Sequence, residues 1–314
     1  MASESEIAFD FPRHFTVYKD GRIEKPWTPT QFFVPPGLDP ATGVESKDVV
    51  ISSETAVKAR LFLPQIAAAS AAQINKLPLI IHFHGGAFCL YSPFISPITT
   101  FLSQLSAAAA AIVLSVDYRL APAHMLPAAY DDCLAALEWA ALHADGNGPD
   151  PWLNNHADLG RVVLLGESAG ANLAHYVAVQ AGAKGLAGPG VDLTRMVLVH
   201  PYFGNEVPDP YYQYMSPGSC GTKGDPRFHP GSDPDLGKME VEEVMVCVAE
   251  KDELRERGVS YFETMRDGGG YGGVLEWYET RGEGHCFHLF KSGSEEAGVL
   301  MEKIVGFVKQ GLKE

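Results

Sequence analysis

Short apolar runs alternate with longer amphipathic stretches along most of the chain. The runs predict strands at Leu79–Phe83, Ala111–Val116, Arg161–Leu165, Met196–Val199, Val244–Ala249 and Leu275–Tyr278. The stretches between them predict helices, including Ala128–His143 and Glu295–Leu312. Strands that alternate with helices usually lie parallel in one sheet. The pattern therefore predicts an α/β protein with a mostly parallel central sheet flanked by helices.

The first part of the chain follows a different pattern. Asp48–Ser52 and Ala56–Leu63 alternate apolar and polar residues across a short polar turn, which predicts an antiparallel hairpin at the sheet edge. Two segments fall outside the predicted sheet, at residues 1–40 and 202–238, and the second is dense in proline, glycine and aromatic residues. Because no linker-like stretch divides the 314 residues, we expect a single domain spanning 1–314.

The stretch Gly166-Glu167-Ser168-Ala169-Gly170 lies between a predicted strand and a predicted helix. A Gly-x-Ser-x-Gly sequence in this context forms a sharp turn that lifts the serine above the sheet edge. A turn this tight needs small neighbours, because a larger side chain would collide with the adjoining strand or helix. The context therefore favours Ser168 as a nucleophile over a loop serine that happens to lie between glycines.

A second glycine-containing motif, His84-Gly85-Gly86-Ala87, follows the strand predicted at Leu79–Phe83. Backbone N–H groups at such a strand end can stabilise the negative oxygen that develops when a hydroxyl attacks an ester carbonyl. We expect Gly85 and Gly86 to supply two of these donors and Ala169, the residue after the serine, to supply the third. The alternative is a plain glycine turn in which His84 holds the loop.

An acid and a histidine follow the serine in the order that this type of site requires. Asp252 begins a loop directly after the strand predicted at Val244–Ala249, and Glu250 and Glu253 are the competing acids. His285 lies in a glycine-flanked loop after the last predicted strand, whereas we expect His288 to be structural. Ser168, Asp252 and His285 are therefore the candidate catalytic residues.

These motifs, with Asp117-Tyr118-Arg119-Leu120-Ala121-Pro122, resemble the hormone-sensitive-lipase-like branch of the α/β-hydrolases. More narrowly, the chain from about Val17 onward resembles the plant carboxylesterases, a group that includes 2-hydroxyisoflavanone dehydratases and the gibberellin receptor. The resemblance implies an α/β-hydrolase fold with a serine nucleophile at Ser168, an acid at Asp252 and a base at His285. It also implies an oxyanion hole from Gly85, Gly86 and Ala169.

The resemblance further implies that residues 1–40 and 202–238 form a cap over the serine. Aromatic and apolar residues near the two glycine motifs and in the second cap segment are then candidates to bind substrate: Phe88, Leu90, Tyr91, Tyr212, Tyr214 and Met215. We expect Arg119 and Asp131 to form a structural ion pair behind the site.

Composition narrows the possible partners. The net charge of −15 argues against nucleic acid and anionic membrane surfaces. No apolar run approaches the length of a membrane span, and residues 1–12 do not resemble a signal peptide. Five cysteines without paired spacing indicate a reducing compartment, and we expect a cytoplasmic protein. The sequence has no zinc-type ligand cluster, and we expect no metal and no cofactor.

The sequence thus predicts a serine carboxylesterase, and the resemblance implies that its substrates are short-acyl esters of small, aromatic or specialised-metabolite alcohols. Two alternatives stay open, a lyase, cyclase or dehydratase that uses the same three residues, and a small-molecule receptor. The gibberellin receptor lacks the histidine found here as His285, and the related dehydratases often carry threonine in place of Ser168. Activity should fall below about pH 6, where an ordinary imidazole becomes protonated.

Overall fold

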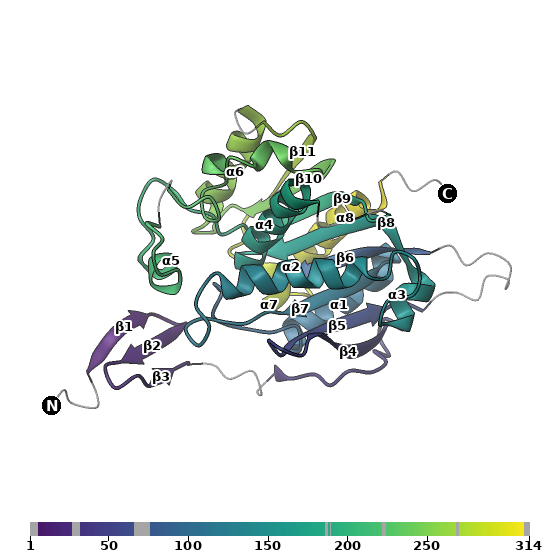
Figure 1. The fold of residues 1–314 in the computed structure, drawn as a ribbon, viewed down its shortest axis with the longest axis horizontal. Coiled ribbons are helices and arrows are strands. Elements are labelled where there is room, and N and C mark those ends of the chain that lie inside the picture. The colour runs from purple at the N-terminus through teal and green to yellow at the C-terminus, as the bar shows by residue number, and fades with distance from the viewer. Residues whose placement is uncertain are drawn as a thin grey trace, which may run out of the picture.

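The computed structural model describes residues 6–26, 32–65, 76–185, 188, 190–221, 224–267 and 270–310. Its centre is an eight-stranded sheet in the order β11-β10-β9-β8-β6-β7-β5-β4 (Figure 1). The strands are β4 (Glu45–Ser52), β5 (Val57–Leu63), β6 (Leu77–Phe83), β7 (Ile112–Asp117), β8 (Ala157–Glu167), β9 (Leu193–Val199), β10 (Glu243–Ala249) and β11 (Val274–Thr280). From β7 to β11 all neighbours are parallel, as predicted.

The predicted edge hairpin is also confirmed, because β4 and β5 pair antiparallel at one end of the sheet. Strand β8 is longer than predicted and runs to Glu167, which pairs with Val199 of β9. The apolar run at Arg161–Leu165 therefore marks only the middle of this strand. The extension matters because it brings the regular sheet to the residue just before Ser168.

Helices cover both faces of the sheet (Figure 1). One face packs against α1 (Ser96–Ala109), α7 (Phe287–Phe290) and α8 (Glu295–Lys309), and the other against α2 (Ala128–Ala141), α3 (Pro151–His156), α4 (Ala169–Lys184) and α6 (Arg255–Asp267). This double cover explains why the inner strands are apolar on both sides rather than alternating. Two hydrophobic clusters result, one on each face.

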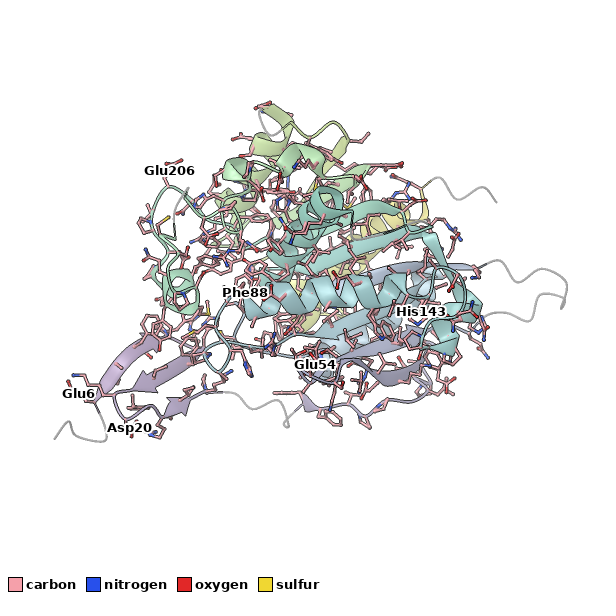
Figure 2. The ribbon with its side chains drawn as sticks, in the orientation of Figure 1. Glu6, Asp20, Glu54, Phe88, His143 and Glu206 are labelled. Carbon is pink, nitrogen blue, oxygen red and sulfur yellow. The ribbon has the colours of Figure 1, made fainter. Side chains whose placement is uncertain are left out.

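The segment before the main sheet forms a small antiparallel sheet of its own, which the sequence did not predict. It contains β1 (Ile7–Phe11), β2 (Phe15–Tyr18) and β3 (Ile23–Glu24). Figure 2 shows Glu6 and Asp20 on the outer side of this sheet, away from the main body. The remaining predicted cap residues at 1–5 and 27–31 lie outside the described residues.

The insertion after β9 contains α5 (Pro210–Met215) and two short 3-10 turns, Pro230–Ser232 and Leu236–Lys238. Its helix α5 lies beside the small N-terminal sheet (Figure 1), where Phe9 stacks on Tyr214 with ring centroids 3.7 Å apart and Phe11 stacks on Tyr211 at 3.9 Å. Two segments about 200 residues apart in the sequence thus form one aromatic layer.

The described helices include none with both the length and the apolar character needed to cross a bilayer. The five cysteines all lie among the described residues and form no disulfide, and Cys133 and Cys247 are buried in the two hydrophobic clusters.

Candidate active site

Ser168 lies on a strained turn between β8 and α4. Its φ of 56° is positive, a conformation that residues other than glycine rarely adopt outside functional sites. A Cβ on Gly166 would lie 2.2 Å from the carbonyl oxygen of Gly170, and a Cβ on Gly170 would lie 1.8 Å from that of Phe83. Both glycines are therefore required by close backbone approach, as the sequence predicted.

The structure brings Ser168, His285 and Asp252 into one hydrogen-bonded row. His285 Nε2 lies 2.9 Å from Ser168 Oγ, and His285 Nδ1 lies 2.8 Å from Asp252 Oδ2. An ionised carboxylate only accepts hydrogen bonds, so the ring carries its proton on Nδ1 and donates it to Asp252. Nε2 is then free to accept from the serine hydroxyl, which is the arrangement needed for a general base.

Asp252 is fixed in this row by a second hydrogen bond. Its Oδ1 accepts the N–H of Leu254 at 2.8 Å, and its side chain has no exposed surface. The competing acids point elsewhere, since Glu253 is exposed and Glu250 accepts the N–H of Gly282. Among the three acids considered, Asp252 is the one that contacts the histidine.

Opposing effects set the protonation of His285. The surrounding protein disfavours the charged ring, whereas Cys286 and the Asp252 carboxylate favour it, and the balance raises the pKa of His285 well above its ordinary value. Burial in turn raises the pKa of the Cys286 thiol, so this thiol is neutral near pH 7. We therefore attribute the raised pKa of His285 to the Asp252 carboxylate. The His285 side chain is 37% exposed, so the ring is accessible from solvent.

The neighbouring histidines are buried and lie around this row. His288 packs edge-on against Phe101, and burial lowers its pKa to about 4, which fits the structural role expected for it. His200, which the sequence analysis did not single out, accepts the N–H of Cys286 on its Nδ1 at 2.9 Å. It thereby supports the loop that carries His285.

The prediction for Gly85 is wrong. Its N–H donates to Oε1 of Glu167 at 2.8 Å and is therefore not available to an oxyanion. Among the described residues, the N–H groups of Gly86 and Ala87 have no protein acceptor. The N–H of Ala169, the first residue of α4, has no acceptor within the helix either. The available donors are Gly86, Ala87 and Ala169.

His84 holds the loop that carries these donors. Its Nδ1 donates to the carbonyl of Gly85 at 2.7 Å, its ring stacks on Tyr118 at 4.3 Å, and burial lowers its pKa to about 4. A neutral, buried ring in this position is part of the loop's structure and does not take part in proton transfer.

The structure divides the predicted substrate-binding residues into two groups. Phe88, Tyr212 and Met215 have 0% exposed surface. A pocket wall must expose some surface, so the pocket prediction is wrong for these three residues. Leu90 is 6% exposed, while Tyr91 and Tyr214 are partly exposed, so a role in binding stays a prediction for these.

The predicted ion pair involves the neighbouring aspartate. Arg119 makes a bidentate contact with Asp132, with Nη2 2.7 Å from Oδ1 and Nε 2.9 Å from Oδ2. Asp131 and Asp132 are consecutive on α2, and Asp132 is the one that faces the interior, at 2% exposed. The prediction of Asp131 was therefore wrong by one helical position.

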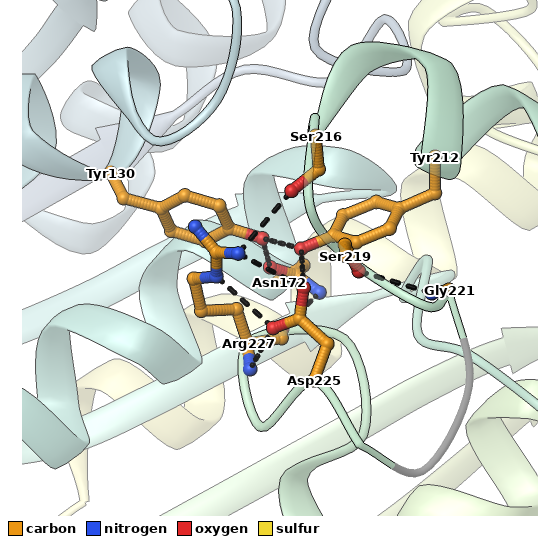
Figure 3. Close-up of polar contacts among 8 residues, drawn as sticks. All are labelled: Tyr130, Asn172, Tyr212, Ser216, Ser219, Gly221, Asp225 and Arg227. Carbon is orange, nitrogen blue, oxygen red and sulfur yellow. Dashed lines mark hydrogen bonds and ion pairs between the residues drawn. The ribbon is translucent and has the colours of Figure 1, made fainter.

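A buried polar cluster joins the insertion to the nucleophile's helix (Figure 3). We call it the Arg227 cluster, and it contains Tyr130, Asn172, Tyr212, Ser216, Asp225 and Arg227. Arg227 binds both carboxylate oxygens of Asp225 at 3.0 Å. Asn172, four residues after Ser168, accepts from Tyr130 Oη at 2.8 Å and donates to the carbonyl of Arg227 at 2.9 Å. This cluster fixes the position of the insertion relative to α4.

One group of described side chains has the spacing of a metal site. His200, His285 and Cys286 each place a possible ligand atom within 4.8 Å of the others. The ring nitrogens of His285 already contact Ser168 and Asp252, and His200 Nδ1 already accepts a backbone N–H. These nitrogen atoms already make hydrogen bonds within the serine site, so we interpret the three residues as part of that site rather than as a metal site.

Comparison with known proteins identifies the family of this chain. A family model described as alpha/beta hydrolase fold matches residues 80–289. Probable carboxylesterase 13 of Arabidopsis thaliana is 37% identical, over 98% of this chain and 99% of the relative. The 2-hydroxyisoflavanone dehydratase of Glycyrrhiza echinata is 35% identical, over 98% and 97%.

Among solved structures, the thermostable carboxylesterase EstE1, cloned from a metagenomic library, superposes with a TM-score of 0.70. It is 25% identical, and the match covers 90% of this chain and 92% of that one. The chain therefore belongs to the hormone-sensitive-lipase-like branch of the α/β-hydrolase family and, within that branch, to the plant carboxylesterases.

Proposed function

We propose that this carboxylesterase hydrolyses short-acyl esters through an acyl-enzyme formed on Ser168. The observation that carries the proposal is the unbroken row from Asp252 through His285 to Ser168, with contacts of 2.8 and 2.9 Å. The strained turn at Ser168 and the three available N–H donors support the same chemistry.

In the first step, His285 Nε2 accepts the hydroxyl proton while Ser168 Oγ attacks the ester carbonyl. The imidazolium that forms is stabilised by Asp252, whose carboxylate is already in place. The N–H groups of Gly86, Ala87 and Ala169 stabilise the negative carbonyl oxygen. His285 then protonates the leaving alcohol, and the acyl group stays on Ser168.

In the second step, water takes the place of the alcohol. His285 removes a proton from the water as it attacks the acyl carbon, and the same N–H groups stabilise the second oxyanion. Collapse of this intermediate releases the carboxylic acid and returns the proton to Ser168. None of these steps uses a cofactor.

The cap contributes to the choice of ester. The N-terminal sheet and α5 share an aromatic layer, and Lys25, just past β3, donates to the carbonyl of Cys89 at 2.7 Å, close to the oxyanion turn. The partly exposed rings of Tyr91 and Tyr214 suit an aromatic or otherwise bulky alcohol.

Hydrolysis of p-nitrophenyl acetate, butyrate and octanoate by the wild type and by Ser168→Ala tests this function. We expect turnover by the wild type that falls with chain length. Loss of the nucleophile should lower kcat by about 10⁴-fold or more. The melting temperature of the variant should stay close to that of the wild type. Near-normal turnover by Ser168→Ala would remove the serine mechanism.

A dehydratase or related lyase is the second candidate, favoured by the 35% identity to a 2-hydroxyisoflavanone dehydratase. The two activities differ in the mass of their products, because hydrolysis adds water and elimination does not. Incubation of an acetyl ester and of a 2-hydroxyisoflavanone with the enzyme, followed by mass spectrometry, separates them. Ser168 favours hydrolysis, since the related dehydratases often carry threonine there.

A cytoplasmic location is part of the proposal and rests on the five cysteines without a disulfide. Imaging of a fluorescent fusion to the whole chain in plant cells tests it, and a signal confined to an organelle would contradict it.

A further inference from the structure

Glu167 lies directly before Ser168, yet the reaction steps make no use of its side chain. The residue is 1% exposed and both of its carboxylate oxygens are engaged. Oε1 accepts the N–H of Gly85 at 2.8 Å, and Oε2 lies 2.8 Å from His82 Nε2. His82 Nδ1 in turn lies 2.8 Å from Ser115 Oγ. One residue from each of the adjacent strands β8, β6 and β7 thus forms a buried polar row beneath the site.

The protons in this row can be assigned from the chemistry of its members. The Glu167 carboxylate only accepts hydrogen bonds, so His82 carries a proton on Nε2 and donates it to Oε2. With the ring proton on Nε2, the Nδ1 atom of His82 accepts from the Ser115 hydroxyl. Every polar atom of the row has a partner, which is the condition for a stable buried network.

The row ends at the turn that carries the oxyanion donors. Just after Gly85, Ala87 and Phe88 have φ values of 51° and 60°, which non-glycine residues adopt only when their surroundings enforce it. On the far side of the turn, the N–H groups of Cys89 and Leu90 donate to the carbonyl of Gly86. On the near side, the N–H of Gly85 donates to Glu167, the last residue of β8 and the one directly before the nucleophile.

A direct backbone approach reinforces this contact. A Cβ on Gly85 would lie 2.9 Å from the carbonyl oxygen of Glu167 and 3.2 Å from the Cβ of Ser168. The turn thus lies against the nucleophile's own backbone, and the Glu167 side chain holds it there. The end of β8 therefore sets the distance from Ser168 to the N–H donors.

We propose that Glu167 is a positioning residue that sets the oxyanion turn relative to Ser168, and that it acts through hydrogen-bond geometry rather than through its charge. The proposal rests on the esterase function described above. His82 and Ser115 in turn orient Glu167.

Glu167→Gln and Glu167→Ala should therefore have different effects on the oxyanion turn. The amide of Glu167→Gln can accept the Gly85 N–H on its oxygen and donate from its nitrogen to His82 Nε2. His82 then carries its proton on Nδ1, and Ser115 Oγ accepts it, because a hydroxyl can both donate and accept. Glu167→Ala leaves Gly85 and His82 without their partner, so the turn loses its anchor.

The test compares wild type, Glu167→Gln and Glu167→Ala, with Asp158→Ala as the matched control. Asp158 is a carboxylate at the other end of β8 that also accepts a glycine N–H, from Gly160 at 3.1 Å. The measurements are kcat and KM for p-nitrophenyl butyrate, and the inhibition constant of a trifluoromethyl ketone, whose adduct with the serine carries an oxyanion. Melting temperatures report on folding.

We expect Glu167→Ala to lower kcat by about 100-fold, as loss of an oxyanion donor does, with KM changed by less than about threefold. The affinity for the ketone should fall in the same proportion as kcat. The kcat of Glu167→Gln should stay within about fivefold of the wild-type value, and the kcat of Asp158→Ala should match the wild-type value. An intact kcat in Glu167→Ala, or an equal loss in Glu167→Gln, would overturn the proposal.

If Glu167→Ala does not fold, the double variant Glu167→Gln/Ser115→Ala decides. Only in the double variant does the proton on His82 Nδ1 lose its acceptor, so kcat should fall at least about tenfold beyond the product of the two single effects. Effects that simply multiply would overturn the proposal. Failure of the esterase function itself looks different, because the wild type then shows no turnover and no binding of the ketone, and the proposal falls with it.

Discussion

The catalytic edge of the sheet and the cap lie close together but are held by different kinds of contact. At the edge, Ser168, His285 and Asp252 sit on turns directly after strands and are joined by hydrogen bonds of 2.8 and 2.9 Å. In the cap, rings from β1 stack on rings from α5, and an ionic contact between Arg257 of α6 and Asp209 ties the insertion to the core.

This difference assigns the reaction chemistry to the edge of the sheet and the selection of the ester to the cap. The strand ends have little freedom, because β8 and β10 are paired on both sides and the edge strand β11 is paired along its length with β10. The reacting atoms are therefore fixed by the architecture. The aromatic layer of the cap has no such frame and can change with the choice of ester. Changes at the edge should therefore lower kcat, while changes in the cap should act mainly on KM and on stability.

Asp252→Asn should give the largest effect among changes that keep Ser168. The amide can hold the ring in the wrong tautomer and cannot stabilise the imidazolium, so we expect kcat to fall by about 10²- to 10⁴-fold. KM for p-nitrophenyl butyrate should change little. The exposed neighbour Glu253→Gln serves as the control, and an equal loss there would contradict the assignment of the acid.

The pH dependence should show the acid limb of a single base. His285 must be neutral to accept the serine proton, and it becomes protonated as the pH falls through its pKa. Asp252 holds this pKa above the ordinary value of about 6.5. As the pH is lowered, kcat/KM should therefore begin to fall while the pH is still above 6.5, and should then drop about tenfold for each further pH unit. This places the limb higher than the value near pH 6 expected from the sequence. A profile that stays flat down to pH 5 would contradict a histidine base.

Arg227→Met should loosen the cap without touching the reacting groups. The change leaves the Asp225 carboxylate, whose side chain is 4% exposed, without its cation. Loss of one partner of a buried pair is costly, but 25% of the Arg227 side chain is exposed, so we expect a loss of about 2–4 kcal/mol in the free energy of unfolding.

KM should rise several-fold in this variant while kcat changes less, as measured by urea unfolding and steady-state kinetics. Arg266→Met is the control, because Arg266 and Asp267 form an exposed pair that should contribute little. A kcat loss larger than the KM change in Arg227→Met would show that the cluster acts on the chemistry.

Phe9→Ala should have the smallest effect. It removes the ring that stacks on Tyr214, a contact worth about 1 kcal/mol beyond burial. We expect KM for an aromatic ester to change by about two- to fivefold and KM for ethyl acetate to change less. Ile7→Ala, an exposed position on the same strand, is the control. Equal changes in KM for both esters would show that the Phe9 ring does not contribute to substrate selection.

The catalytic edge could be predicted from the sequence because its signals are local. Runs such as Leu79–Phe83 mark strands within a few residues of β6, and the order of Ser168, Asp252 and His285 follows from motifs at strand ends. The same motifs could not show which N–H groups are free. Gly85 is engaged only because Glu167, 82 residues away, points toward it.

The cap was harder to predict because its contacts are long-range. Nothing within residues 202–238 shows that Tyr212 faces the core and Tyr214 faces Phe9. A short helix in a proline-rich segment has no clear apolar face, so the side that packs inward depends on distant partners such as Tyr130 and Phe88, which contact Tyr212. The choice of Asp131 over Asp132 failed for the related reason that the rotation of α2 was not fixed by its pattern.

The most direct test of the account is covalent labelling by diethyl p-nitrophenyl phosphate, followed by peptide mass spectrometry. We expect one diethylphosphoryl group per chain, on the peptide that contains Ser168, with activity lost in proportion to labelling and no label in Ser168→Ala. Complete inactivation with the label on another residue, or labelling of Ser168 that leaves turnover intact, would contradict an acyl-enzyme on Ser168.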